Sequence, residues 1–281
     1  MREVNVSLVT DKVAELLIKS CCVIPDDLYA MYKEVAAKEV SPLGRHAMEQ
    51  IIENADIARK ENIASCQDTG VALIFIDIGQ EVHCIGGDLE EAIQKGVVKG
   101  YADGFLRKSS VGDPLFDRKN PGDNSPGVVH MRVVPGDKIH LRVAPKGFGS
   151  ENKAQLKMLM PADGVEGFKN YVYQVVKEAG ADPCPPIVVG VGVGGTLEKC
   201  AMMAKIASMR DVSSSNPDPR YAKLEEEIRA MINKTGVGPQ GFGGRYTCLK
   251  VNIEYYPTHM GGLPVAVNIN CHAARHAEAT L

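Results

Sequence analysis

The spacing of hydrophobic residues changes several times along the chain, and each change predicts a new element. Apolar residues recur with the spacing of an amphipathic helix at Val9, Val13, Leu16 and Leu17. A second helix is expected over about residues 26–40, after a proline. A third should begin at residue 42, because Ser-Pro at 41–42 has the form of an N-cap followed by the first helical residue. The pattern therefore predicts a helical N-terminal part over about residues 1–60.

The rest of the chain alternates between strand-like and helix-like patterns. The apolar run at 71–78 predicts a buried strand, and the alternating segments VVHMRVV and KIHLRVA predict a hairpin around Pro135-Gly136-Asp137. Residues 109–127 are rich in Ser, Gly, Pro, Asp and Asn and predict a loop. Further helices are expected at 88–106, 164–179, 196–208 and 219–234, and further strands at 186–192, 247–254 and 264–270.

This order of elements indicates the fold class. Three helices followed by mixed strand and helix units are typical of an α/β or mixed α+β fold. We expect one domain over residues 1–281, in which the helical N-terminal part packs on a mixed β-sheet body with surrounding helices.

Composition narrows the possible partners. The chain has 281 residues with 44% hydrophobic and 24% charged, which is ordinary for a globular protein. Its net charge of −3 gives no reason to expect a nucleic acid or an anionic membrane as partner. The first residues, MREVNVSLVTDKVAELL, include acidic side chains and no long apolar core, and no run approaches the ~20 apolar residues of a membrane span. We therefore expect a cytoplasmic protein without a membrane segment.

The 8 cysteines contain no C-x-x-C pair. In a cytoplasmic chain of this length they do not read as a disulfide framework. The missing pair also argues against zinc ribbons, thioredoxin-like redox motifs and ferredoxin-type clusters in their usual spacing. Any metal site must gather cysteines from distant parts of the chain.

The segment GVGVGG at 190–195 satisfies the G-x-G-x-x-G pattern of dinucleotide-binding proteins. Asp211 follows about twenty residues later, where that pattern places an acid. However, the residues before Asp211 are predicted to be helical, and no second βαβ half follows. Two interpretations remain: a nicotinamide-binding module, or glycines that let a strand and a helix pack closely beside a ligand.

Two other segments resemble functional motifs only in part. GFGSENKA at 147–154 lacks the Gly-Lys-Ser/Thr ending of a phosphate-binding P-loop, which leaves a flexible glycine loop able to bind a carboxylate, or a plain turn. CHAARH at 271–276 would place two histidines one helical turn apart but lacks the glutamate of metalloproteases. A zinc site from Cys271 and His276 is weakly supported, and the histidines read as surface or packing residues.

The stretch ASCQDTG at 64–70 places a thiol, an amide, a carboxylate and a hydroxyl at the edge of the predicted strand 71–78. It is either a polar turn that contains a cysteine or one wall of a reaction site. The blocks that decide between these are, in order along the chain, CQDTG, FLRKSS, KGFGSENK, PCPP, GVGGT, GFGGRY, THMGG and NINCH. As a set, over essentially the whole chain, they resemble the α subunit of two-subunit class I fumarate hydratases and L(+)-tartrate dehydratases, which are iron–sulfur hydro-lyases.

The resemblance implies a cofactor. In that family a [4Fe-4S] cluster is held by three cysteines, whose places fall here on Cys66, Cys184 and Cys271. Three thiolates leave the fourth iron open, so that it can act as a Lewis acid on a C–OH bond. The five cysteines without a matching place are interpreted as small core residues: Cys21, Cys22, Cys84, Cys200 and Cys248.

The resemblance also implies substrate contacts. Gln67 and Asp68 would line the substrate, with Asp68 tuning a base, and Arg107 would bind a carboxylate. Gly149 would offer a backbone N–H, and His259 would hydrogen-bond the substrate or its departing group. Alternatives remain for two of them, since Arg107 could cap its helix and Asp68 could bond the amides of its own turn.

Finally, the resemblance implies partners. Longer single-chain relatives carry further arginines, a lysine and a base in a C-terminal region that has no counterpart here. A separate β subunit is therefore expected to complete the site. The expected assembly is α2β2, built on an α–α homodimer. The expected reaction is hydration of a C4 dicarboxylate, with fumarate to malate (a step of the tricarboxylic acid cycle) favoured over dehydration of L(+)-tartrate. A different-class alternative, a metal-stabilised assembly subunit without activity, remains beside the nicotinamide module.

Overall fold

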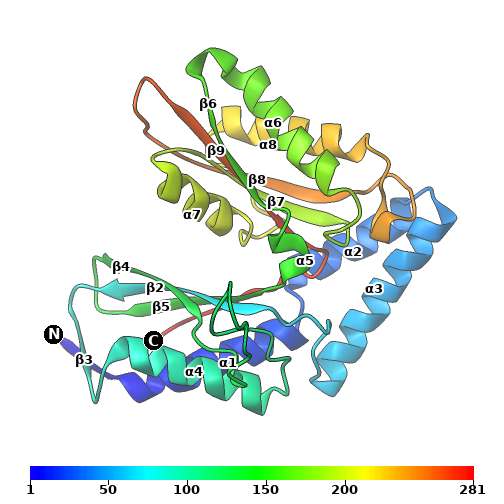
Figure 1. The fold of residues 1–281 in the computed structure, drawn as a ribbon. Helices are drawn as coiled ribbons and strands as arrows, with labels where there is room; N and C mark the ends of the chain where they lie inside the picture. Colours follow the sequence, from blue (N-terminus) through cyan, green and yellow to red (C-terminus); the bar gives the residue numbers. More distant parts are fainter. The chain divides into compact units, whose positions relative to one another are not determined.

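A computed structural model describes all 281 residues, and the chain divides into two compact units (Figure 1). Unit 1 comprises Met1–Pro25, Ala55–Phe148 and Arg275–Leu281, and unit 2 comprises Asp26–Asn54 and Gly149–Ala274. Each unit has its own sheet, helices and hydrophobic core, so the predicted mixed α/β class is confirmed. The predicted helical N-terminal part is divided between the two units.

Unit 1 is a four-stranded sheet of order β10-β5-β2-β4, with two helices packed on one face (Figure 1). Its core forms where side chains of these helices, such as Val13 and Ile93, meet side chains of the sheet, such as Ile74 and Leu141. The elements are β1 (Arg2–Asn5), α1 (Val6–Cys22), β2 (Val71–Gly79), β3 (Val82–Ile85), α4 (Leu89–Asp103), β4 (Val128–Val134), β5 (Ile139–Lys146) and β10 (Ala277–Thr280).

The predicted hairpin in unit 1 is wrong. Strands β4 and β5 exist and the chain turns at Pro135-Gly136, but the two strands do not pair, because β2 lies between them. β2 runs parallel to β4 and antiparallel to β5. The turn instead binds the end of β2, where Gly79 N–H donates to the carbonyl of Lys138 at 2.8 Å and Gln80 N–H to that of Val134 at 2.8 Å.

Unit 2 is a second four-stranded sheet, of order β6-β9-β7-β8, with α7 on one face and α6 and α8 on the other (Figure 1). Only β7 and β8 are parallel to each other. The elements are α2 (Asp26–Lys38), β6 (Gln155–Leu159), α6 (Gly164–Ala179), β7 (Ile187–Gly194), α7 (Leu197–Ala207), α8 (Pro219–Asn233), β8 (Cys248–Tyr256) and β9 (Leu263–Asn270). Two helices contain residues of both units, α3 (Pro42–Glu61) and α5 (Phe148–Glu151).

The glycines of GVGVGG serve packing. A Cβ atom on Gly190 would lie 2.2 Å from the carbonyl oxygen of Ala204, and one on Gly192 would lie 2.1 Å from that of Cys200. Only glycine lets α7 lie this close to β7. Because the surrounding sheet has a single parallel pair, it also lacks the strand arrangement of a dinucleotide-binding fold. The close packing of strand and helix that was one interpretation of this motif is observed; its place beside a ligand stays a prediction.

No helix of the structure is both long and apolar enough to cross a membrane.

Candidate active site

The CQDTG turn leads directly into β2 of unit 1, and the side chain of Tyr101 forms hydrogen bonds with it. Tyr101 is fully buried on α4, and its hydroxyl lies 3.0 Å from the carbonyl oxygen of Thr69 and 2.8 Å from that of Gly70. Burial raises the pKa of Tyr101 far above its ordinary value of 10.0, so the hydroxyl keeps its proton and stays a donor. The turn is therefore fixed to the core of unit 1.

Asn124 joins the turn to the FLRKSS segment. Its side chain is completely buried, and its Nδ2 donates to the carbonyl of Gly70 at 3.0 Å. Its Oδ1 accepts the N–H groups of Ser109 and Ser110 at 2.6 Å and 2.8 Å. One side chain in the predicted loop 109–127 thus ties two of the family-like blocks together.

Asp68 bonds backbone amides. Its Oδ1 accepts the N–H of Gly70 at 3.0 Å and its Oδ2 accepts the N–H of Phe148 at 2.9 Å. A Cβ on Gly147 would lie 3.0 Å from Oδ2, so glycine lets the KGFG segment approach. The buried Arg275 donates to the carbonyl oxygen of Asp68 at 2.7 Å. The alternative interpretation, a carboxylate that bonds turn amides, therefore describes the contacts of Asp68 in this structure.

Unit 1 brings Cys66, Gln67, Asp68 and Arg107 together. The Cys66 thiol is half-buried and lies 3.5 Å from Oε1 of Gln67, which is exposed. Arg107 is exposed beyond the end of α4, and its carbonyl accepts the Thr69 hydroxyl at 3.1 Å. These contacts place the Cys66 thiol and the Gln67 amide on the anchored turn and the backbone of Arg107 beside it.

Unit 2 brings Cys184 and Cys271 together. Cys184 precedes β7 and Cys271 directly follows β9, and the N–H of His272 donates to the carbonyl of Cys184 at 3.1 Å. Standard bond lengths then keep the two cysteine Cα atoms within about 8 Å of each other. Cys184 is exposed and has a φ of 54°, in the left-handed region that non-glycine residues rarely adopt. Because Cys66 belongs to unit 1, a ligand set of all three cysteines stays a prediction.

The other five cysteines are in different surroundings. Four of them are buried and Cys84 is half-buried. Burial raises the pKa of the thiol to about 12 in Cys21 and Cys248 and to about 11 in Cys200, and it also raises the pKa in Cys22 and Cys84. A thiol with a raised pKa keeps its proton and is a poor metal ligand. These environments agree with the interpretation of all five as packing residues.

The segment that carries Gly149 is a short helix, α5, with charged anchors. Glu151 at its end forms an ion pair with Lys205 of α7, whose pKa is lowered by burial even though the carboxylate opposes this. Lys153 forms an ion pair at 2.5 Å with Asp182, which lies two residues before Cys184. The predicted flexible glycine loop is therefore held to both α7 and the turn that carries this cysteine.

The structure does not bring His259 together with Cys184 or Cys271. His259 lies in the loop that joins β8 to β9, while both cysteines lie at the opposite end of the same sheet. β9 has 8 residues, and a strand rises about 3.3 Å per residue, so its ends are about 23 Å apart. The segment CHAARH is not helical, so its two histidines are not stacked one turn apart.

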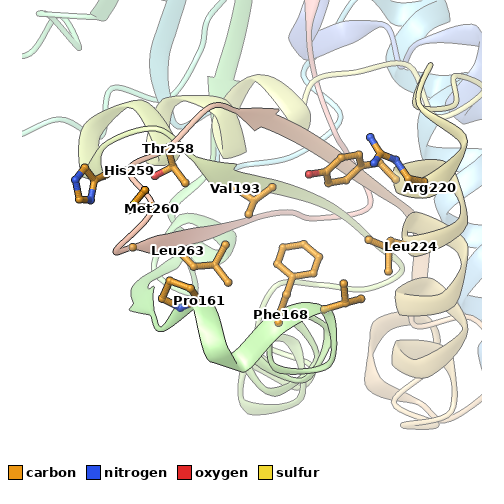
Figure 2. Close-up of a pocket in the computed structure, with 13 residues that line it drawn as sticks. Pro161, Phe168, Val193, Arg220, Leu224, Thr258, His259, Met260 and Leu263 are labelled. Atoms are coloured by element: carbon orange, nitrogen blue, oxygen red, sulfur yellow. The ribbon is translucent and has the colours of Figure 1, made fainter.

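His259 lines the edge of a cavity of about 510 Å³ at that end of the sheet (Figure 2). The walls are apolar, with Phe168 of α6 and Leu224 of α8 facing Val193 and Leu263 of the sheet. Arg220, the one charged residue that lines it, is paired with Asp218 at 2.6 Å. The cavity is therefore an apolar hollow and does not contain the thiols.

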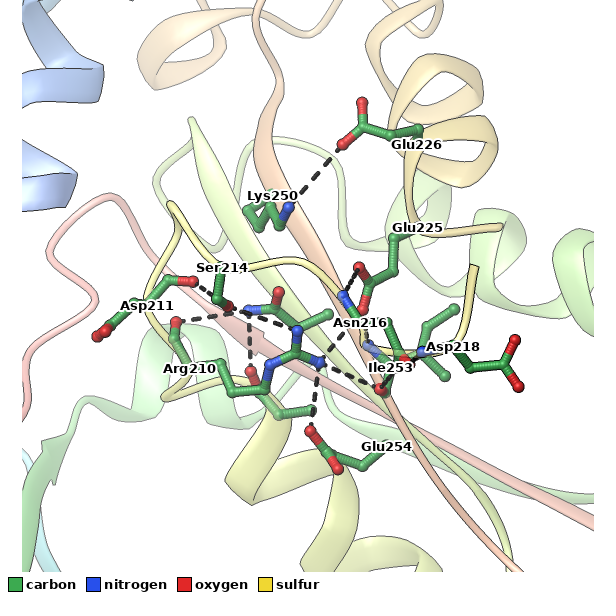
Figure 3. Close-up of polar contacts among 12 residues, drawn as sticks. Arg210, Asp211, Ser214, Asn216, Asp218, Glu225, Glu226, Lys250, Ile253 and Glu254 are labelled. Carbon is green, nitrogen blue, oxygen red and sulfur yellow. Dashed lines mark hydrogen bonds and ion pairs between the residues drawn. The ribbon is translucent and has the colours of Figure 1, made fainter. Parts of the chain in front are cut away.

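A buried polar network fixes the loop that follows α7 (Figure 3). Nη1 of Arg210 lies 3.2 Å from Glu225 on α8, 3.2 Å from Glu254 on β8 and 3.2 Å from the carbonyl of Ile253. Glu225 also accepts the N–H groups of Ile253 at 2.8 Å and Asn216 at 3.2 Å. These polar groups bind one another, which indicates a structural anchor between α8 and β8.

Glu39 holds the GFGGRY segment. It is buried, and its carboxylate accepts the N–H groups of Arg245 at 2.9 Å and Tyr246 at 3.1 Å, together with those of Val40 and Ser41. Burial by itself would raise the pKa of Glu39, but the hydrogen bonds from Ser41, Arg245, Tyr246 and Val40 outweigh it, and the pKa is lowered. Glu39 therefore stays ionised and stabilises this loop.

Sequence reasoning missed the residues that hold these turns, namely Tyr101, Asn124, Arg275 and Glu39. Each is a polar side chain that lies near its partner only after folding. The one signal available is chemical: a buried polar group needs a partner, but burial itself was not predictable at these positions.

Comparisons with known proteins show the family to which the chain belongs. The family described as fumarate hydratase (Fumerase) matches residues 10–280. A provisionally named L(+)-tartrate dehydratase subunit alpha of Methanocaldococcus jannaschii is 38% identical over 275 residues, which is 96% of each chain. The L(+)-tartrate dehydratase subunit alpha of Escherichia coli is 30% identical in strain UTI89 and 29% in strain K12, over 100% of this chain and 96% of theirs.

These matches cover nearly the full length of the chain, and they define a hydro-lyase. The chain belongs to the fumarate hydratase (Fumerase) family. Its resemblance to the α subunits of the class I enzymes is confirmed.

Proposed function

We propose that the chain is the α subunit of an iron–sulfur hydro-lyase that acts on a C4 dicarboxylate, with Cys66, Cys184 and Cys271 holding a [4Fe-4S] cluster. The observation that carries the proposal is the pairing of Cys184 with Cys271 through the His272 N–H. Thiolates are the ligands that iron–sulfur clusters require, and the remaining cysteines have raised pKa values that make them poor candidates. When bound, a cluster with three protein ligands supplies an open iron that acts as a Lewis acid on a C–OH group.

Residues of unit 1 would bind and orient the substrate. Arg107 is exposed, and its planar guanidinium suits a carboxylate, which it can bind through two parallel hydrogen bonds. Gln67 offers an exposed amide beside the Cys66 thiol. Asp68 would act as a positioning residue, because both of its oxygens bond backbone amides and so fix the shape of two loops. The proton acceptor would then come from a β subunit.

In unit 2, we assign Gly149 a backbone N–H for the substrate, since α5 is anchored by its charged neighbours. His259 needs a different arrangement, because about 23 Å of strand separates it from Cys184 and Cys271. We therefore retain His259 as a substrate residue only in trans, completing the site of a second copy of the chain in an α–α dimer.

The choice between the two reactions depends on one hydroxyl, which tartrate carries and malate, the hydration product of fumarate, lacks. The sequence favoured fumarate, while the relatives compared here are named as tartrate dehydratase subunits, which favours L(+)-tartrate. An enzyme distinguishes such substrates by pocket groups that bind or reject the hydroxyl, and part of this pocket would lie on the β subunit.

The test is anaerobic co-expression of the chain with a β subunit, followed by analysis of iron and acid-labile sulfide. Hydration of fumarate and dehydration of L(+)-tartrate are then measured on the same preparation. We expect iron, sulfide and turnover of at least one substrate, and loss of all three in a Cys66→Ser variant. A colourless preparation that binds NAD, or one that contains only zinc, would contradict the proposal.

A further inference from the structure

The GFGGRY loop contacts both segments that carry the cysteine pair, and Gln240 makes these contacts. Gln240 precedes that block by one residue and has a φ of 52°, a left-handed conformation like that of Cys184. Its backbone N–H and its side-chain Nε2 each donate to the carbonyl oxygen of Pro185, both at 2.7 Å. Two donors from one residue therefore converge on the carbonyl of the residue that directly follows Cys184.

The same side chain reaches the second cysteine segment. Nε2 of Gln240 lies 3.1 Å from Nδ1 of His272, and that Nδ1 lies 3.2 Å from the carbonyl oxygen of Cys184. If Nδ1 carries no proton, it accepts from Gln240; if it is protonated, it donates to Cys184. In either tautomer a hydrogen bond links the residue after Cys271 to its neighbours.

The loop that presents Gln240 is itself fixed within unit 2. After Gln240 in the chain, the N–H groups of Arg245 and Tyr246 donate to the carboxylate of Glu39. Before Gln240 in the chain, the N–H of Gly238 donates to the hydroxyl of Thr247 at 3.0 Å. The loop is thus fixed by hydrogen bonds on both sides of Gln240.

From these contacts we propose that Gln240 is a positioning residue that sets the spacing of Cys184 and Cys271 before metal is bound. It is not a ligand. It acts by holding the carbonyl of Pro185, the residue after Cys184, and the imidazole of His272, the residue after Cys271, in one arrangement, so that metal binding does not have to order them. The proposal rests on the proposed function, since it assigns the pair a role in holding a cluster.

The test compares Gln240→Ala and Gln240→Gly with a control, Gln155→Ala, whose amide contacts only the exposed Glu178 at 3.2 Å. Glycine adopts the left-handed conformation without strain, so agreement of the two Gln240 variants isolates the lost side chain. The first readout is amide hydrogen exchange of residues 271–274 in the iron-free chain. The second is the rate at which a chelator removes iron after anaerobic reconstitution, with the thermal midpoint measured in parallel.

We expect exchange of this segment to be about tenfold faster in both Gln240 variants, which corresponds to the loss of about one hydrogen bond. We expect iron to be held about 10- to 100-fold less tightly, the effect usual for partners of metal ligands, at a nearly unchanged thermal midpoint. Gln155→Ala should change neither readout.

Failure of this inference is distinguishable from failure of the proposed function. If the wild-type chain binds a cluster and the Gln240 variants exchange and retain iron as it does, the positioning role is wrong and the function stands. If the wild-type chain binds no cluster under any condition, the proposed function is wrong, and with it the metal role of Gln240. Faster exchange without faster iron loss also overturns the proposal, because it reduces Gln240 to a loop contact.

Discussion

Replacing Glu225 with alanine should strongly destabilise unit 2, although the neighbouring Glu226 can be replaced at little cost. The Glu225 side chain is 1% exposed, and its loss would leave the Arg210 guanidinium, itself 15% exposed, with one carboxylate in place of two. The N–H groups of Ile253 and Asn216 would also lose an acceptor. Removing one partner of a buried ion pair typically costs about 3–5 kcal/mol, and we expect a loss in this range.

Glu226 is a control on the same helix because its side chain is 53% exposed; it forms an ion pair with Arg229 at 2.5 Å and a longer one with Lys250 at 3.9 Å. Exposed pairs of this kind contribute about 0.3–0.5 kcal/mol. Both variants should be unfolded in urea and followed by circular dichroism, with two transitions fitted if the units unfold separately. If the free energies of unfolding of the two variants agreed within about 1 kcal/mol, the network would not be the anchor that its geometry indicates.

Four further predictions follow from other parts of the structure. Cys200→Ser and Cys248→Ser should leave the iron content unchanged at a packing cost of about 1–3 kcal/mol, and iron loss in a folded variant would show that the ligands were misassigned. The pKa of Glu39 is lowered on folding, so its contribution to stability is present above the ordinary pKa of 4.5 and is lost as the pH falls through the lower folded pKa. The free energy of unfolding should therefore fall more steeply below about pH 4.5 in the wild type than in Glu39→Gln. Parallel profiles of urea denaturation against pH would contradict this. The chain alone, with its cluster rebuilt, should show negligible dehydratase activity, since positioning and proton transfer each contribute several kcal/mol; robust turnover without a partner would contradict this. Finally, mixing inactive His259→Asn and Cys184→Ser chains with the β subunit should restore part of the activity, and no recovery in mixed dimers would exclude the trans arrangement.

The fold was predictable where a pattern is local. The stripe of Val9, Val13 and Leu16 identified α1, and the apolar run at 71–78 identified β2, because burial of one helix face or one strand leaves its mark on adjacent residues. The pairing of strands leaves no such mark. A turn at Pro135-Gly136 between two alternating segments looks the same whether the strands pair directly or accept β2 between them.

The candidate site shows the same division. Thiols and an arginine in recognisable blocks were assigned by resemblance, and the structure joins the segments of two of them, Cys184 and Cys271, by one hydrogen bond. The side chains that hold the blocks could not be found. Asn124 sits in a polar loop and reads as a turn residue, yet it is completely buried between two blocks that lie far from it in the sequence. Its role depends on contacts that exist only after the sheet has formed.

Unit 1 is built from three separate stretches of the chain, and this affects the order in which the protein folds during synthesis. Strand β5 ends at residue 146, but its neighbour β10 and the buried Arg275 follow only after the chain of unit 2 has been made. At the usual rate of translation, about 130 residues take on the order of 10 s. Throughout that interval β5 presents an unpaired edge, which is the kind of surface that pairs with other chains. The unit that begins folding first is therefore the last to be completed, and this edge of β5 stays open until residues 277–280 have been made.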